Sequence, residues 1–194
     1  MSISRDDLIA FEADIAACFE RGEIKGPVHL SGGNEDQLIE IFKEIKPTDW
    51  VFSTWRNHYH ALLHGVPPEK LKAHLLKGPS MNVNFPEHRF LTSAIVGGIL
   101  PIACGVAAGL KRAGSSKKVW CFVGDMAATT GAYTEALRYC DSWELPVKFV
   151  VESNGYSTNT PVTSTWLFWP RIPGRKYVYD RTYPHCGIGK WVTF

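Results

Sequence analysis

Apolar residues recur along the chain at two spacings, and the helical spacing dominates its first half. They fall every three or four positions over the first twenty residues, which predicts a helix there. The same spacing predicts a second helix after Gly33-Asn34 and two more between 55 and 78, divided by Pro67-Pro68. Residues 79–93 are dense in Pro, Asn and Ser, so we expect a loop there.

Continuous apolar runs predict buried strands at 49–54, 117–125 and 145–154. A small-residue apolar helix is expected over 94–114 and another helix over 131–144. A strand, helix and strand with nearly continuous apolar strands is typical of a parallel unit covered on both faces. The predicted fold class is therefore α/β, a parallel β-sheet with helices on both faces. We expect one domain over 1–165 and an aromatic-rich strand or tail over 166–194, packed on the domain or on a partner.

The composition mainly argues against certain partners and sites. Of the 194 residues, 21 are basic and 19 acidic, and a net charge of +2 gives no broad electrostatic reason to expect nucleic acid or a membrane as partner. The first residues predict an amphipathic acidic helix and not a signal peptide. The five cysteines are odd in number and form no CxxC pair, which favours buried thiols in a reducing compartment over a zinc site. We therefore expect a cytoplasmic protein.

Oxygen-bearing side chains end two of the predicted strands. Asp125 follows one strand and Asn154 follows the other, so both should lie at the same edge of the sheet. With a main-chain carbonyl from the Gly155-Tyr156 turn they form a hard-oxygen set suited to Mg²⁺. The amino end of the helix after Thr130 would favour an anion such as a diphosphate. The plainer alternative is that Asp125 caps the helix and Asn154 is a turn residue.

This stretch resembles the thiamine-diphosphate motif, Gly-Asp-Gly followed along the chain by Asn-Asn. More closely, the chain resembles the alpha subunit of the decarboxylating component of 2-oxoacid dehydrogenases of the pyruvate, branched-chain and acetoin types. The matching segments are Gly124-Asp125-Met126-Ala127, Gly131 to Glu135-Ala136, Leu145-Pro146, Glu152-Ser153-Asn154-Gly155-Tyr156, Trp55-Arg56-Asn57-His58, Gly78-Pro79-Ser80-Met81-Asn82 and Ala94-Ile95-Val96-Gly97.

The resemblance implies a thiamine-diphosphate-binding fold and assigns roles to individual residues. Mg²⁺ would be bound by the side chains of Asp125 and Asn154 and by the carbonyl of Tyr156. The diphosphate would lie against Gly124, Met126 and Ala127 and meet Trp55, Arg56 and His58. The guanidinium of Arg56 is a planar donor fork suited to phosphate oxygens. The aminopyrimidine ring would be held at Ile95 and Val96.

The implied function is that of the magnesium- and diphosphate-binding subunit of a thiamine-dependent enzyme, decarboxylating a small 2-oxoacid or ketone substrate and transferring its acyl unit. In this family the glutamate that activates the cofactor comes from a separate beta subunit with a pyrimidine domain. We therefore expect a beta-like partner, in a heterotetramer or around a homodimer of this chain. Two alternatives stay open: a transketolase-like or acyloin carboligase half-subunit, and a degenerate interaction protein without catalysis.

The chain departs from the family pattern at several positions. Met126 replaces the second glycine of Gly-Asp-Gly, and its side chain must point away from the diphosphate. The family's alpha subunits continue well past the Asn-x-Tyr loop, so the resemblance implies an unusually short form. The segment around His185 faintly resembles a later family strand, which makes His185 a candidate catalytic residue, although a solvent-facing turn histidine is as reasonable. Aromatic residues in the tail suit a partner surface or the edge of the core: Trp166, Phe168, Trp169, Tyr177, Tyr179, Tyr183 and Trp191.

Overall fold

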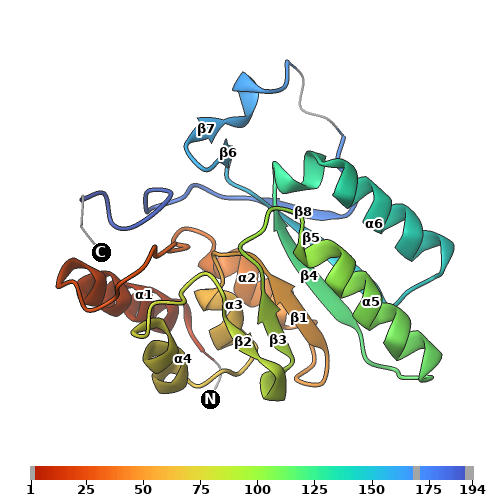
Figure 1. The fold of residues 1–194 in the computed structure, drawn as a ribbon, viewed down its shortest axis with the longest axis horizontal. Helices are drawn as coiled ribbons and strands as arrows, with labels where there is room; N and C mark the ends of the chain where they lie inside the picture. The colour runs from red at the N-terminus through yellow and green to blue at the C-terminus, as the bar shows by residue number, and fades with distance from the viewer. Residues whose placement is uncertain (1–2, 168–170, 191–194) are drawn as a thin grey trace.

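The structure is a computed structural model that describes residues 3–167 and 171–190. A six-stranded sheet runs through the described part of the chain in the order β2-β3-β1-β4-β5-β8 (Figure 1). Its strands are β1 (Trp50–Ser53), β2 (Asn84–Phe85), β3 (Phe90–Thr92), β4 (Val119–Gly124), β5 (Val147–Ser153) and β8 (Arg175–Val178). All pairings are parallel except that of β2 with β3. The sheet confirms the predicted α/β fold class.

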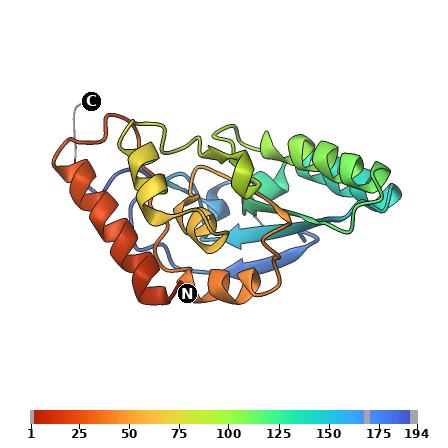
Figure 2. The ribbon, with the colours of Figure 1, turned by 90° about the horizontal axis from the view of Figure 1, so that it is seen from below.

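Helices cover both faces of the sheet, as the apolar strands predict. They are α1 (Arg5–Glu20), α2 (Glu35–Phe42), α3 (His58–Leu63), α4 (Pro68–Leu75), α5 (Ile99–Arg112) and α6 (Gly131–Ser142). The buried side chains of α1 to α4 belong to one apolar core, and those of α5 and α6 belong to the other. Figure 1 shows the two groups apart, and Figure 2 shows β5 and β8 side by side, pointing the same way.

Alternation along the central strands divides their side chains between these two cores. In β4, Trp120 and Phe122 join the core of α1 to α4, whereas Val119, Cys121 and Val123 join that of α5 and α6. Successive side chains of a strand point to opposite faces, so a strand covered on both sides must be apolar at every position. This explains why the sequence shows runs without polar interruptions.

Residues 79–93 contradict the loop expected there. They hold β2, the short helical turn η1 (Pro86–His88) and β3, and β3 pairs in parallel with β1. Three residues are too few to establish a periodic pattern, and β3 is a strand because tertiary pairing with Val51–Ser53 gives its backbone hydrogen-bond partners. The sequence alone does not carry that information.

The segment after β5 contains a hairpin and a turn that the sequence did not indicate, and a strand within the range where a strand or tail was expected. A small hairpin joins β6 (Tyr156–Ser157) to β7 (Thr160–Pro161), and the turn η3 (Val162–Ser164) follows it. Strand β8 then pairs with β5 in the main sheet. Of the tail aromatics, Phe168, Trp169 and Trp191 lie outside the described residues. No helix in the described parts of the chain has the length and apolar character needed to cross a bilayer.

Candidate functional site

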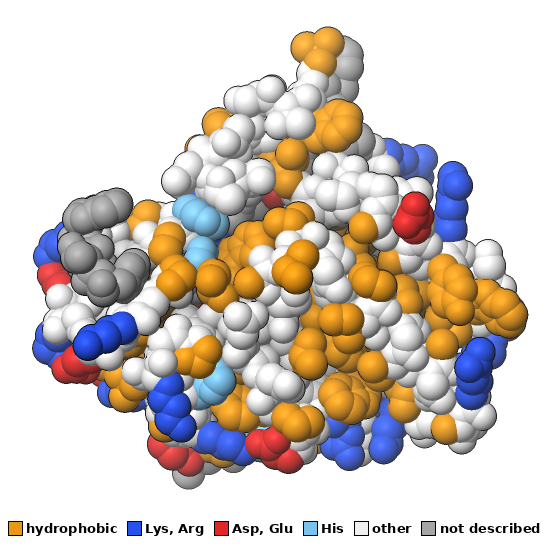
Figure 3. All heavy atoms as spheres, in the orientation of Figure 1, with side chains coloured by type: hydrophobic (Ala, Val, Ile, Leu, Met, Phe, Trp, Pro, Cys, Tyr) orange, Lys and Arg blue, Asp and Glu red, His pale blue; other side chains and the backbone are white. Residues whose placement is uncertain are grey.

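A cavity of about 400 Å³ opens at the carboxyl edge of the sheet, beside the amino ends of α5 and α6. Its volume lies within the range of small-molecule and cofactor sites. The space-filling view shows the molecule hollowed below the β6–β7 hairpin, with hydrophobic side chains gathered along the rim (Figure 3). Eleven of the twelve predicted site residues line the cavity: Trp55, Arg56, Ile95, Val96, Gly124, Asp125, Met126, Ala127, Asn154, Tyr156 and His185.

Asp125 lies at the base of the cavity, only 2% exposed, directly after β4. Its Oδ1 accepts the N–H of Met126 at 2.7 Å, and its Oδ2 accepts the N–H of Gly155 at 2.8 Å and the hydroxyl of Ser153 at 3.3 Å. Burial raises the pKa of this carboxyl, and the hydrogen bonds from Gly155 and Met126 oppose that shift. These hydrogen bonds hold the carboxylate in one orientation at the base of the cavity.

The turn after β5 brings Asn154 to Asp125. In the parallel register Gly124 lies opposite Glu152, so the residues that follow each strand meet at one edge. The Oδ1 of Asn154 accepts the N–H of Tyr156 at 3.0 Å, and its Nδ2 donates to Tyr179 at 3.2 Å. Gly155 has φ +77°, the left-handed region that glycine enters without strain, and this lets the chain turn sharply there.

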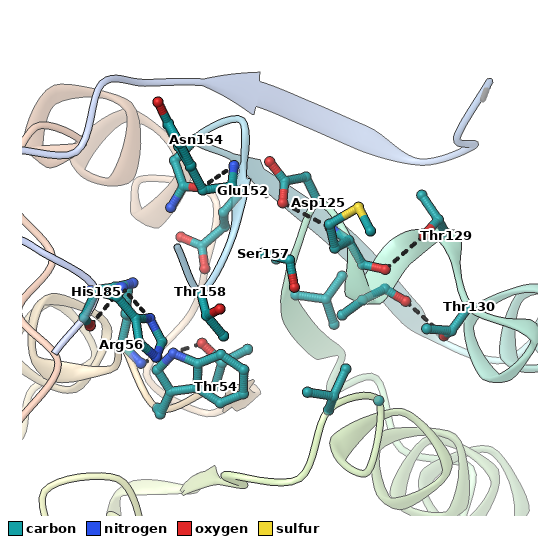
Figure 4. A pocket seen from close by; sticks show the side chains of 18 of the residues that line it. Thr54, Arg56, Asp125, Thr129, Thr130, Glu152, Asn154, Ser157, Thr158 and His185 are labelled. Atoms are coloured by element: carbon teal, nitrogen blue, oxygen red, sulfur yellow. Dashed lines mark hydrogen bonds between the residues drawn. The ribbon is translucent and has the colours of Figure 1, made fainter. Parts of the chain in front are cut away.

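The wall between β4 and α6 contains the predicted diphosphate contacts. Met126, at φ −70° and ψ −31°, leads into the turn η2 (Ala127–Thr129), so its backbone does not require glycine. Thr130 caps α6 by accepting the N–H of Tyr133 at 3.4 Å, and Thr129 and Thr130 both line the cavity (Figure 4). A Cβ added to Gly124 would meet no protein atom within 4 Å. That position needs no glycine for packing within this chain, so a side chain there would occupy cavity space.

Arg56 and His185 form the opposite wall (Figure 4). Arg56 is buried, and its guanidinium donates to the carbonyl of Leu30 at 2.6 Å and to the carbonyl of His185 at 2.9 Å. It also reaches the Nδ1 of His185 at 3.2 Å, which makes Nδ1 the acceptor and leaves the proton on Nε2. Burial, with the nearby charges of Arg56 and Arg181, lowers the pKa of His185 to about 4, so this histidine is neutral near pH 7.

Ile95 and Val96 lie at the rim, where they are 74% and 58% exposed. Exposed apolar side chains beside a cavity are suited to contact an apolar or aromatic ring.

His58 is the predicted site residue that the structure places elsewhere. It is fully buried, with Nε2 3.1 Å from the hydroxyl of Ser80 and Nδ1 3.2 Å from the carboxylate of Glu12. It lies behind the cavity wall and is not among the residues that line the cavity.

Several cavity residues were not assigned from the sequence. Glu152 accepts hydrogen bonds from Tyr177 and from the Nε2 of His60, at 3.1 Å in the second case. Thr158, Tyr179 and Arg181 also line the cavity, two of them from the chain just after β8. The carboxyl ends of parallel strands meet at one edge, which places the segment after β8, with the candidate His185, at the cavity.

The donor set fits a magnesium ion with few protein ligands. Within the described ranges no group of three or more His, Cys, Asp or Glu side chains is placed to hold a metal. A cation at Asp125 would therefore rely on one carboxylate together with amide and carbonyl oxygens, and phosphate and water would complete its shell.

Comparison with known proteins gives consistent matches. A family model described as "Dehydrogenase E1 component" matches residues 4–166. The alpha subunit of acetoin:2,6-dichlorophenolindophenol oxidoreductase from Cupriavidus necator is 32% identical over 160 residues, covering 77% of this chain and 48% of the relative. The alpha subunit of the pyruvate dehydrogenase E1 component from Porphyra purpurea is 33% identical over 164 residues, covering 76% and 48%. The chain spans about half the length of these relatives.

Among solved structures, one described as a thiamin diphosphate-dependent enzyme isolated from Mycobacterium smegmatis resembles this chain. The match covers 81% of this chain and 25% of the other chain. The TM-score is 0.47 and the sequence identity 17%, so this likeness carries no functional argument.

Proposed function

The chain belongs to the dehydrogenase E1 component family, and on that basis we propose that it is the magnesium- and diphosphate-binding half of a thiamine-diphosphate-dependent enzyme. The observation that supports this most is that Asp125 accepts hydrogen bonds from Ser153 and Gly155, in the turn that follows β5. All three residues of the proposed metal site, which would bind the ion through the side chains of Asp125 and Asn154 and the carbonyl of Tyr156, line the cavity. The capped amino end of α6 lies at the same cavity and favours an anion.

Each wall then has a task. Gly124, Met126 and Ala127 would hold the diphosphate on one side, Trp55 and Arg56 would bind it from the other wall, and Ile95 and Val96 would contact the aminopyrimidine ring. His58 supports this wall from behind through Ser80 and Glu12. Neutral His185, with its proton on Nε2, can donate a hydrogen bond to a substrate oxygen.

The reaction we propose is decarboxylation of a small 2-oxoacid with transfer of the acyl unit to an acceptor. When bound, thiamine diphosphate supplies the carbon nucleophile and the electron sink that this chemistry needs. The relatives are named as alpha subunits, and we infer that this chain likewise works with a beta-like partner carrying the pyrimidine domain, in a heterotetramer or around a homodimer. Its five free thiols fit a reducing compartment such as the cytoplasm.

Calorimetry tests the site assignment. We expect thiamine diphosphate to bind in the presence of Mg²⁺, and Asp125→Ala to abolish the magnesium-dependent part because the one carboxylate of the proposed metal site is lost. Asp141→Ala, which removes an exposed carboxylate of α6, is the matched control and should bind as the wild type does. Unchanged affinity in Asp125→Ala would refute the site.

A non-catalytic interaction protein is the second candidate, and Met126 is the observation that favours it. Its side chain lines the cavity at the position where the family motif has glycine. If it blocks the cofactor, wild type should fail to bind thiamine diphosphate even with the partner present, and Met126→Gly should restore binding. If the cofactor is accommodated, as we propose, Met126→Gly should change its affinity little.

A further inference from the structure

Arg181 is a charged residue of the cavity to which the motifs assign no role. It lies in the segment after β8 and lines the cavity together with Arg56 and His185. Its guanidinium donates to the carbonyl of Thr158 at 3.0 Å and lies over the ring of Tyr156, 5.5 Å from the ring centroid. Both contacts are with the β6–β7 hairpin, whose residue Tyr156 supplies the proposed carbonyl ligand of the metal.

Arg56 has few donors left for an anion. Of the five N–H groups of a guanidinium, it uses one on the carbonyl of Leu30 and at least one more on His185. Arg181 has a single hydrogen bond, to Thr158, among those found in the described chain. It therefore keeps more of its fork available for a ligand in the cavity.

The charges around Arg181 favour an anion at this end of the cavity. Arg56, Arg181 and His185 line the same cavity, and both arginines lower the pKa of His185. The cavity's carboxylates are those of Asp125 and Glu152, and neither makes a salt bridge with Arg181 among the ion pairs found in the described residues. Two guanidinium groups lining one cavity repel each other, and a bound anion would relieve that repulsion.

We propose that Arg181 is a second arginine ligand of the diphosphate group, binding it together with Arg56 and joining it to the β6–β7 hairpin. This rests on the proposed function. A diphosphate has several anionic oxygens and can occupy two guanidinium forks, whereas a substrate carboxylate has two oxygens and fills one. The contact of Arg181 with Tyr156 places it beside the proposed metal site, where diphosphate and Mg²⁺ would meet.

Calorimetry with Mg²⁺ and inorganic pyrophosphate on the 194-residue chain tests this proposal. We expect wild type to bind, Arg181→Gln to bind at least about tenfold more weakly, and Arg181→Lys to fall between them because it keeps the charge and loses the fork. Arg175→Gln is the matched control, since Arg175 also follows the β5–β8 connection but pairs with Glu44 away from the cavity. Melting temperatures of the variants show whether each is folded.

The outcomes separate the two proposals. If wild type does not bind pyrophosphate with Mg²⁺, the proposed function fails and this inference with it. If wild type binds and folded Arg181→Gln binds equally well, the function stands and the role of Arg181 is overturned. The inference is also overturned if Arg181→Gln keeps its affinity for pyrophosphate but loses binding of pyruvate, because Arg181 would then recognise a substrate carboxylate.

Discussion

The histidines of this chain differ in the charges beside them, and this decides what each can do. His58 and His60 lie against the carboxylates of Glu12 and Glu152. His29 and His185 lie against each other, with ring centroids 4.8 Å apart, beside the guanidinium of Arg56. His60 was given no role from the sequence, yet it positions Glu152 in the cavity wall. The residue type is the same in each case, so only the tertiary structure shows which histidines lie beside a carboxylate and which lie beside an arginine.

We predict that His29 makes the protein less stable in mild acid. Burial, helped by Arg56 and His185, lowers the pKa of His29 from 6.5 to about 3. Between these values the unfolded chain binds a proton that the folded chain does not, so stability falls as the pH drops through 6.5. From pH 7 to pH 5 the loss in the free energy of unfolding from this one group should reach roughly 2 kcal/mol.

Urea denaturation at pH 7 and pH 5 measures this loss. His29→Gln should reduce it, leaving the parts due to His64 and His185, whose pKa values are lowered in the same direction. His74→Gln is the control, because His74 is partly exposed and bonded to the carbonyl of Asn82. A variant His29→Gln with the full wild-type loss would contradict the prediction.

Elements with a clear apolar pattern could be predicted, the four-residue strand β1 included, and the strands of two or three residues could not. Strands β4 and β5 and helices α1, α5 and α6 each extend over enough residues for a periodic pattern to emerge. Strand β3 has three residues and pairs with the distant strand β1, and the two strands of the β6–β7 hairpin have two residues each, too few to show a periodic pattern. Two consequences followed: a loop was expected at 79–93, and Arg181 was assigned no role, although the same segment made His185 a candidate.

The packing of the start of β8 against α6 can be tested by a substitution at Gly174, the residue just before the strand. This glycine has φ +107°, and a Cβ there would approach the hydroxyl of Tyr133 to 2.8 Å. That hydroxyl donates to the carbonyl of Pro173 at 2.7 Å and ties α6 to the start of β8. We expect Gly174→Ala to cost about 1–3 kcal/mol of unfolding free energy, because strain and a displaced hydrogen bond add together.

Chemical denaturation of the purified chain measures this cost. Gly105→Ala provides the contrast: Gly105 is exposed in the middle of α5, and a Cβ there would meet nothing within 4 Å. That change should stabilise the isolated chain by roughly 0.5–1 kcal/mol, since alanine is the better helix former. Equal effects of the two substitutions would show that β8 is not held as described.

At the scale of the whole molecule, the cavity has the features of a half-site. Its walls supply oxygen ligands, arginines and an apolar rim. Its two carboxylates, Asp125 and Glu152, are already held by hydrogen bonds within the described chain. We infer that activation of the aminopyrimidine ring falls to a glutamate of a partner subunit, as the resemblance implies.

We predict that the purified chain does not decarboxylate 2-oxoacids by itself. Adding a pyrimidine-domain partner should produce turnover, because the partner brings the missing carboxylate to the cofactor. Release of carbon dioxide from pyruvate, with thiamine diphosphate and Mg²⁺ present, is a direct assay. The mixture containing Asp125→Ala serves as the negative control. Robust turnover by the chain alone would rule out the half-site proposal.

The sequence by itself determined the α/β class, the burial of the sheet on both faces and the placement of Asp125 and Asn154 at one edge of the sheet. These follow from local patterns: continuous apolar runs, helical spacing, and polar residues placed just after strands. The tertiary structure decided that His58 lies behind the wall, that Glu152 is held by His60 and Tyr177, and that Arg181 enters the cavity. Each of these depends on contacts between residues far apart in the chain, which spacing along one segment does not encode.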